Sequence, residues 1–140
     1  MPRSAKDVLS QVPLFASLSS RHRRRLADSV KEARFMQGAK VVREGEVGES
    51  FFVILEGEAR VENAKGRVVN RLYPGEFFGE ISLLDGGERT ATVVAETPLV
   101  TLELTRRAFR KVVEQEPVVA VKLLEYSAGL LRRLERPISA

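Results

Sequence analysis

A short stretch, residues 75–93, contains the residue types and spacing needed to hold a sugar phosphate. Glu80 directly follows Gly79, and Arg89 comes nine residues later with Thr90 beside it. A glycine turn that opens a short helix exposes backbone N–H groups suited to a phosphate, which an arginine fork can neutralise. A carboxylate in the same loop can accept hydrogen bonds from sugar hydroxyls. The stretch therefore contains groups for both halves of a ribose phosphate.

The composition excludes several other kinds of site. The chain has 140 residues, 44% of them hydrophobic, which is enough for one domain with one core. It has no cysteine, so disulfides, thiolate chemistry and cysteine-based zinc sites are excluded and a reducing compartment fits best. The sequence contains neither an apolar stretch like that of a signal peptide nor an apolar run of membrane-spanning length. We therefore expect a cytoplasmic protein without a membrane span.

The chain offers little for catalysis. Its one histidine, His22, cannot supply the clustered ligands of a metal-dependent β-roll enzyme. There is no cysteine nucleophile, and no serine has a plausible base partner in the sequence. We therefore expect no catalytic residue, no metal and no cofactor, and we do not expect an enzyme.

The basic residues do not indicate nucleic acid. The net charge of +4 is mild, and much of it comes from residues 21–25, a run of four arginines interrupted by His22. Five consecutive helical positions cover every face of a helix, so they form no stripe that could follow a groove. We interpret the run as a solvated helix surface and His22 as a surface residue.

The elements that must position the stretch are indicated by the pattern before and after it. The first third is predicted to be helical to about residue 34, with Ser19 or Ser20 as an N-cap and Leu26, Val30 and Ala33 at helical spacing. Glycine turns then separate six β-like runs, which are Lys40–Arg43, Ser50–Leu55, Glu58–Glu62, Val68–Leu72, Ala91–Ala95 and Leu99–Leu104.

After the strands the chain returns to helix. Thr105 can cap a helix over Arg106–Glu114, and Pro117 suits the first turn of a second helix, Val118 to about Glu135. Many short strands with closely spaced turns are typical of a sandwich or barrel. The predicted fold class is α+β: an antiparallel β-roll (jelly-roll barrel) over about 35–105, flanked by N-terminal helices within about 5–34 and two C-terminal helices within about 106–136.

With this order of elements, the central segment resembles the phosphate-binding cassette of the cyclic nucleotide-binding domain family. That family includes the regulatory subunits of cyclic-AMP-dependent protein kinase, cyclic-nucleotide-gated channels and bacterial catabolite activator proteins. The matching residues are Phe78–Leu84 and Arg89–Val93, and the spacing from Glu80 to Arg89 is similar to that of the kinase and channel members. Residues 12–19, 44–46 and 51–57 also resemble family signatures, so the resemblance covers nearly the whole chain.

The resemblance implies a role for each cassette residue. By position, Glu80 is expected to accept the ribose 2′-hydroxyl, and Arg89 is expected to bind the exocyclic oxygens of the cyclic phosphate. The N–H groups of Ile81, Ser82 and Ala91 are candidates to complete the phosphate cage, and Gly79, which forms the turn before them, is also expected to be a ligand-binding residue.

The base is less well specified. In eukaryotic members a hydroxyl at the position of Thr90 is associated with acceptance of cyclic GMP, but bacterial cyclic AMP receptors also carry one, so Thr90 does not decide the base. By position, a residue of the final helix is expected to cover the base, and the candidates are Arg133, Leu134 and Glu135.

The resemblance therefore implies a cyclic nucleotide-binding sensor or regulatory module in which ligand binding in the β-roll moves the C-terminal helices. Cyclic AMP is the expected ligand, and cyclic GMP stays open. A second copy or an effector could bind along the C-terminal helix, whereas direct DNA binding is not expected because no helix-turn-helix follows that helix. Two alternatives remain: the sensor half of a longer transcription regulator or channel, and a degenerate scaffold in which Glu80 pairs with Arg89.

Overall fold

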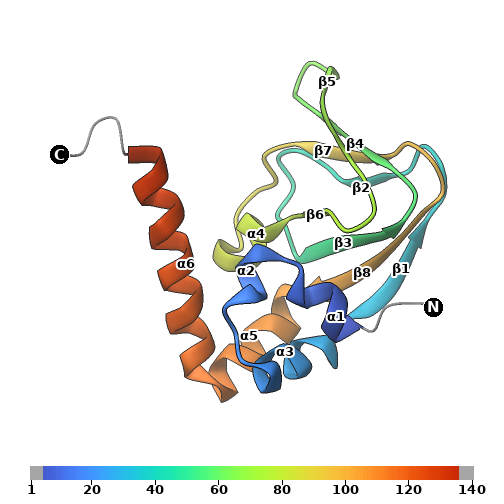
Figure 1. Cartoon of the computed structure of the whole chain (residues 1–140). Helices are drawn as coiled ribbons and strands as arrows, with labels where there is room; N and C mark the ends of the chain where they lie inside the picture. The colour runs from blue at the N-terminus through green and yellow to red at the C-terminus, as the bar shows by residue number, and fades with distance from the viewer. Residues whose placement is uncertain (1–4, 136–140) are drawn as a thin grey trace.

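The computed structural model describes residues 5–135, which form two four-stranded antiparallel sheets with most helices gathered against the first (Figure 1). The strand order is β1-β8-β3-β6 in the first sheet and β2-β7-β4-β5 in the second. The strands are β1 (Lys31–Phe35), β2 (Lys40–Val42), β3 (Ser50–Glu56), β4 (Ala59–Glu62), β5 (Val68–Leu72), β6 (Phe77–Phe78), β7 (Thr92–Ala95) and β8 (Leu99–Thr105). The helices are α1 (Ala5–Ser10), α2 (Pro13–Ala16), α3 (Ser20–Ala27), α4 (Glu80–Asp85), α5 (Arg106–Gln115) and α6 (Pro117–Glu135). The predicted fold class is confirmed.

Strand β3 is buried on both faces because it lies between two hydrophobic cores. Phe51 belongs to the core shared with the helices, and Phe52 belongs to the core between the sheets. Successive side chains of a strand point to opposite faces, so a strand between two cores becomes a nearly continuous apolar run. Phe51 packs edge-on against Phe15 of α2 with ring centroids 5.6 Å apart, and Phe52 stacks on Phe78 of β6 at 5.1 Å. Strand β3 thus joins the helices to the segment that leads into α4.

The N-terminal helices end earlier than the sequence predicted. Ser19 caps α3 as expected, with its hydroxyl accepting a hydrogen bond from the backbone N–H of His22 at 3.2 Å. The helix ends at Ala27, however, and residues 31–35 form β1, which pairs with β8. The prediction of helix through Ala33 is therefore wrong, because cross-strand pairing outweighs a weak helical spacing of only three apolar residues.

Strand β6 was also missed, because two residues are too few to show an alternating pattern. It pairs with β3 through Phe78, whose Cα partner is Phe52. This short pairing fixes the point at which the chain turns into α4.

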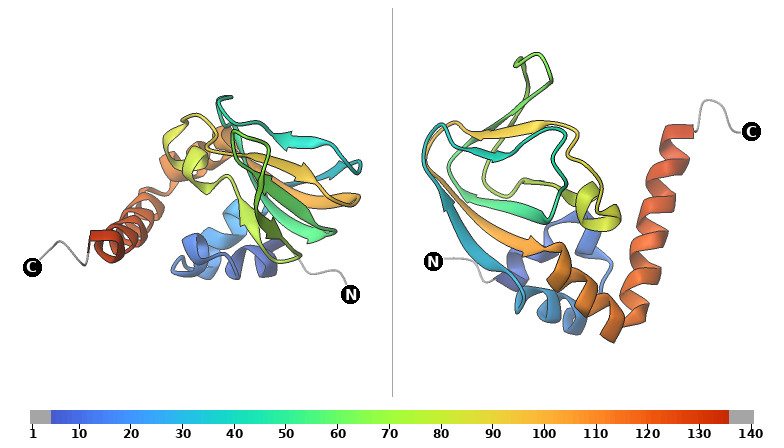
Figure 2. Two further views of the ribbon diagram at one scale, coloured as in Figure 1. Left: turned by 90° about the horizontal axis from the view of Figure 1, so that it is seen from above. Right: turned by 180° about the vertical axis from the view of Figure 1, so that it is seen from behind.

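The two C-terminal helices begin where the sequence predicted. The Thr105 hydroxyl accepts a hydrogen bond from Ala108 N at 3.1 Å and caps α5, and Pro117 occupies the first turn of α6. Helix α6 leaves α5 and runs along one side of the roll (Figure 2). Leu123 in its first half is buried, whereas Leu134 near its end is 76% exposed. Residue 136 lies outside the described residues, and within residues 5–135 no helix is both long and apolar enough to cross a membrane.

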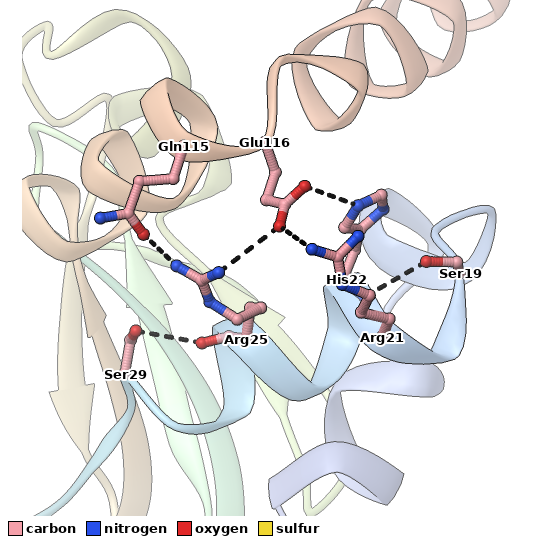
Figure 3. Close-up of polar contacts among 7 residues, drawn as sticks. All are labelled: Ser19, Arg21, His22, Arg25, Ser29, Gln115 and Glu116. Atoms are coloured by element: carbon pink, nitrogen blue, oxygen red, sulfur yellow. Dashed lines mark hydrogen bonds and ion pairs between the residues drawn. The ribbon is translucent and has the colours of Figure 1, made fainter.

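Basic side chains of α3 surround Glu116 at the joint between α5 and α6, and we call this group the joint cluster (Figure 3). Arg21 Nη2 lies 2.8 Å and Arg25 Nη1 lies 3.4 Å from Glu116 Oε1, and His22 Nε2 lies 3.3 Å from Oε2. Arg25 also donates to the side-chain oxygen of Gln115. The His22 side chain is only 12% exposed, so its interpretation as a surface residue is wrong. Arg21 and Arg25 of the run also pair with Glu116, so their guanidinium groups are not simply solvated.

Candidate functional site

The residues predicted to contact a ligand line a single cavity of about 230 Å³. Its lining residues come from α4, β6, the Arg89 loop and the second sheet. Figure 1 shows how these elements are arranged. It brings together all seven predicted contact residues, namely Gly79, Glu80, Ile81, Ser82, Arg89, Thr90 and Ala91. Their side chains differ in exposure: Ser82 and Arg89 are buried, whereas Ile81 and Thr90 are exposed.

The glycine turn before α4 has the conformation that the sequence required. Gly79 has φ of +91° and ψ of 10°, in the left-handed region that favours glycine, and it precedes the first helical residue, Glu80. Ile81 and Ser82 follow in the first turn, where helix geometry provides no intrahelical acceptor for the backbone N–H. The turn therefore presents N–H groups at the wall of the cavity.

Arg89 is fixed by its backbone and enclosed by two glycines. Its N–H donates to Glu46 O at 2.8 Å, and its carbonyl accepts from Gly45 N at 2.9 Å. A Cβ on Gly79 would lie 2.6 Å from Arg89 Nη1, and a Cβ on Gly48 would lie 2.9 Å from Nε. Both glycines are therefore needed for the guanidinium to occupy this position, and sequence reasoning found only the first.

The Arg89 guanidinium is buried and only partly satisfied. Its side chain donates from Nη2 to Ser50 O at 2.7 Å, but Nη1 is buried with no hydrogen-bond partner among the described residues. Burial lowers the pKa of Arg89, while the carboxylates of Glu49 and Glu103 act in the opposite direction. A buried donor without a partner costs roughly 1–3 kcal/mol, more when charged, so this position favours an external acceptor.

Glu80 contributes a half-buried carboxylate at the start of α4. Within the described residues, no ion pair or hydrogen bond joins the side chains of Glu80 and Arg89. The Glu80–Arg89 pair of the degenerate-scaffold alternative is therefore not formed in this structure. Both groups remain available to an occupant of the cavity.

Sequence reasoning missed the wall opposite α4. This wall comes from the second sheet and is mainly apolar, with Asn70 as its one amide among the described lining residues. Asn70 and Leu72 lie two residues apart on β5 and so face the same side of the sheet. The Cα partner of Asn70 on β4 is Val61, which also lines the cavity. The period-two alternation of these strands could have identified the wall. The other apolar residues of this wall are Val42 and Val93, and Phe77 and Phe78 of β6 in the first sheet line the cavity beside it.

The residues predicted to cover the base do not meet the cavity. Arg133 and Leu134 are exposed near the end of α6 and do not line it, and the side chain of Glu135 lies outside the described positions. No group of three or more histidine, cysteine, aspartate or glutamate side chains suited to a metal ion occurs within residues 5–135. Among the described residues, the cavity is thus bounded by α4, the Arg89 loop, β6 and the second sheet.

Comparison with known proteins agrees with this arrangement. Residues 32–116 match the family model described as the cyclic nucleotide-binding domain. Among curated proteins, the chain is 40% identical over 115 residues to the cAMP-dependent protein kinase regulatory subunit of Eremothecium gossypii and 41% identical over 106 residues to that of Mucor circinelloides. These matches cover 82% and 74% of the chain but only 25% of each relative, so the chain spans about a quarter of their length.

Solved structures show the same similarity. The N-terminal domain of a transcriptional regulator from Streptomyces coelicolor matches with a TM-score of 0.84 and 32% identity, covering 96% of both chains. The catabolite activator protein of Thermus thermophilus matches with a TM-score of 0.71 and 30% identity, covering 90% of this chain and 61% of that one. The family model covers more than half of the chain, a curated relative is 40% identical over 82% of it, and a solved structure shares its fold. The chain therefore belongs to the cyclic nucleotide-binding domain family.

Proposed function

We propose that this domain binds cyclic AMP in the cavity beside α4 and couples binding to a movement of its C-terminal helices. One observation carries the proposal: Arg89 Nη1 is buried and unpartnered among the described residues, next to the glycine turn that opens α4. A cyclic phosphate would give this nitrogen a hydrogen-bond acceptor and would give the guanidinium a negatively charged partner.

The cavity has a suitable group for each part of the ligand. The exocyclic phosphate oxygens accept from Arg89 and from the N–H groups of Ile81, Ser82 and Ala91. Glu80 accepts from the ribose 2′-hydroxyl, which a carboxylate beside the phosphate position can reach. The base lies along the apolar wall of the second sheet.

Calorimetric titration with cyclic AMP tests the phosphate contact. Replacement Arg89→Leu removes at least one charge-assisted hydrogen bond, each worth about 1.5–3 kcal/mol, so the affinity should fall at least tenfold. Arg34→Leu is a matched control, because Arg34 on β1 is 70% exposed and pairs with Glu32 away from the cavity. Equal affinity of the intact chain and Arg89→Leu would refute the assignment. No binding by the intact chain would favour the degenerate scaffold.

The choice of base rests on two polar side chains of the cavity, Asn70 and Thr90. An asparagine amide matches the donor and acceptor on one edge of adenine, whereas a hydroxyl can serve either purine. We therefore favour cyclic AMP over cyclic GMP. Titration of Asn70→Ala should show a larger loss for cyclic AMP than for cyclic GMP, and an equal loss for both would remove this basis for the choice.

Helix α4 supports the proposed coupling because it borders two cavities. Its first turn lines the ligand cavity, and Leu84 near its other end lines an apolar groove of about 460 Å³. The groove also includes Phe109 of α5 and Leu123 and Leu124 of α6. A ligand that draws the first turn of α4 toward its phosphate changes the shape of this groove and hence the position preferred by α6.

Distance measurements between spin labels test the movement. The chain has no cysteine, so labels can be attached at Lys65→Cys in the β4–β5 turn and Arg132→Cys on α6, both exposed positions. Cyclic AMP should change the inter-label distance distribution, and the same pair in an Arg89→Leu background should not respond at that ligand concentration. An unchanged distribution in a ligand-saturated domain would refute the coupling. A shift that closes α6 over the cavity would bring Arg133, Leu134 or Glu135 toward the base.

The exposed stripe of α6 supports contact with a partner. Val121, Leu124, Leu131 and Leu134 are each at least half exposed and recur at heptad-like spacing. We include a second copy or an effector helix as the partner in this proposal. Sedimentation with and without cyclic AMP tests self-association, and a monomer at all concentrations would leave only an effector.

A further inference from the structure

Ser50 connects Arg89 to a carboxylate that the proposed ligand contacts do not use. The Ser50 carbonyl accepts the Arg89 Nη2 bond at 2.7 Å, and the Ser50 hydroxyl donates to Glu103 Oε2. Ser50 is 6% exposed, and its Cα partner on β8 is Thr105. One buried residue therefore holds the guanidinium on one side and a carboxylate on the other.

Glu103 reaches Ser50 from the neighbouring strand. It lies on β8 opposite Phe52 of β3 and is half-buried. Glu103, Ser50 and Arg89 line a second cavity of about 200 Å³, so Arg89 borders both this cavity and the proposed ligand cavity. The second cavity is polar and also contains the carboxylates of Glu46 and Glu49.

We propose that Glu103 is a positioning residue for the ligand: it holds Ser50 and, through the Ser50 carbonyl, aims the Arg89 guanidinium so that Nη1 meets the phosphate. The inference rests on the proposed function, because it requires Arg89 to bind the ligand. Glu103 itself touches no part of the ligand. Its effect on binding is therefore expected to pass through Arg89, by way of the Ser50 hydrogen bond or of the attraction between the Glu103 carboxylate and the guanidinium.

Two replacements separate the hydrogen bond from the charge. Glu103→Ala removes the acceptor of the Ser50 hydroxyl and should lower the affinity for cyclic AMP about three- to tenfold, the effect of one hydrogen bond. Glu103→Gln keeps an oxygen acceptor and should stay within about twofold of the intact chain. Glu32→Ala is the control for loss of a carboxylate, because Glu32 lies on the adjacent strand β1 and pairs with Arg34.

Double-mutant cycles identify the path. Ser50→Ala keeps the carbonyl but removes the hydroxyl, so it should weaken binding as Glu103→Ala does, and the double replacement should weaken it no further. In an Arg89→Leu background, Glu103→Ala should have no further effect on the residual affinity. An undiminished effect in that background would overturn the inference, because Glu103 would then act independently of Arg89.

A phosphate-specific measurement excludes a merely structural role. Replacing one exocyclic phosphate oxygen by sulfur weakens the acceptor that faces Arg89, so the two phosphorothioate diastereomers should bind the intact chain unequally. Glu103→Ala should reduce that inequality, with denaturant unfolding measured in parallel to confirm that the variant is folded. An unchanged diastereomer ratio with reduced affinity for both would overturn the inference.

The outcomes distinguish this inference from the proposed function. If the intact chain binds cyclic AMP and Arg89→Leu weakens binding, full affinity in Glu103→Ala overturns the positioning role alone. If the intact chain does not bind, the proposed function fails and the positioning role fails with it.

Discussion

The joint cluster and the Arg89 site both combine arginine with glutamate, but they differ in whether their charges are satisfied. At the joint, one carboxylate, Glu116, has contacts with two guanidinium groups and an imidazole. At the cavity, one guanidinium has a single carbonyl acceptor and a buried nitrogen without a partner among the described residues. The first arrangement pairs its carboxylate within the protein, whereas the second leaves a donor that the proposed ligand would satisfy.

Charge density alone therefore does not identify a binding site in this domain. The arginine run at residues 21–25 is the most basic segment of the chain, yet two of its arginines and His22 contact Glu116, and Arg23 donates to the carbonyls of Ala16 and Leu18. Arg89 has no basic neighbour in sequence. Arg23 of the run and Arg106 also have a buried Nε without a partner among the described residues, so an unsatisfied donor alone does not distinguish Arg89. Arg89 differs because it is buried as a whole residue and lines the cavity beside Gly79, where a bound acceptor can satisfy the donor.

The largest expected effect follows from replacing Gly79, because the new side chain would displace the Arg89 guanidinium from its unsatisfied position. In Gly79→Ala the new Cβ lies 2.6 Å from Arg89 Nη1 and 2.8 Å from Ser50 O, so the guanidinium must move. We expect more than a tenfold loss of affinity for cyclic AMP by calorimetry. Gly66→Ala is a matched control, because Gly66 also has positive φ but a Cβ added there would meet no atom within 4 Å. If both variants lost affinity to a similar extent, backbone strain and not the clash with Arg89 would explain the loss.

A second prediction concerns Glu80, whose carboxylate is unpaired with Arg89 in this structure. Glu80→Gln replaces a charge-assisted hydrogen bond to the ribose by a neutral one and should weaken cyclic AMP binding about five- to tenfold. The 2′-deoxy analogue should bind the intact chain weakly and lose little more in the variant. Glu88→Gln, in the same loop but exposed and outside the cavity lining, should bind as the intact chain does. Equal losses for the two ligands in Glu80→Gln would exclude the 2′-hydroxyl contact.

Replacing Glu116 tests the other side of the comparison. Glu116→Ala leaves two guanidinium groups and the His22 imidazole without their shared carboxylate and should lower the free energy of unfolding by about 1–2 kcal/mol in denaturant titrations. The affinity for cyclic AMP should change less than threefold. Glu125→Ala, which removes an exposed pair with Lys122 on α6, should cost less than about 0.5 kcal/mol. A tenfold loss of affinity in Glu116→Ala would show that the joint cluster belongs to the binding site after all.

The smallest expected effect comes from replacing Thr90, which tests whether the binding site includes the residue next to Arg89. Thr90 is exposed at the cavity, so Thr90→Ala should change the ratio of affinities for cyclic AMP and cyclic GMP by only about threefold, the effect of one weak neutral hydrogen bond. Thr90→Ser, which keeps the hydroxyl, should preserve the ratio. An unchanged ratio in the alanine variant would exclude Thr90 from base selection.

The local chemistry of the cassette was largely predictable from sequence, whereas its supports were not. Gly79, Glu80 and Arg89 lie within ten residues of one another, in the turn before α4, the helix itself and the loop after it. Their closeness in space therefore follows from their closeness in sequence. Ser50 and Glu103 are 39 and 14 residues from Arg89, and β-sheet pairing brings them together. Local patterns contain no information on such pairings, because register depends on the whole sheet.

The same limit explains the errors in the helical regions. The contact of the His22 side chain with Glu116 spans 94 residues, so no local pattern could reveal it. The strand β1 was hidden because three apolar residues happened to fit a helical spacing, and only pairing with β8 decides its conformation. The predicted positions of Arg133, Leu134 and Glu135 over the base remain untested, since a cover formed by α6 depends on the position of that helix.

Strand β3 has a consequence for how the domain unfolds. Its side chains belong to the helical core and to the inter-sheet core in alternation, so the loss of either core exposes apolar side chains of this strand. The helices and the roll should therefore melt together in one cooperative transition, without a partly unfolded species that keeps only the roll. Calorimetric and van't Hoff enthalpies should agree, and amide hydrogens of β3 should exchange only through global unfolding.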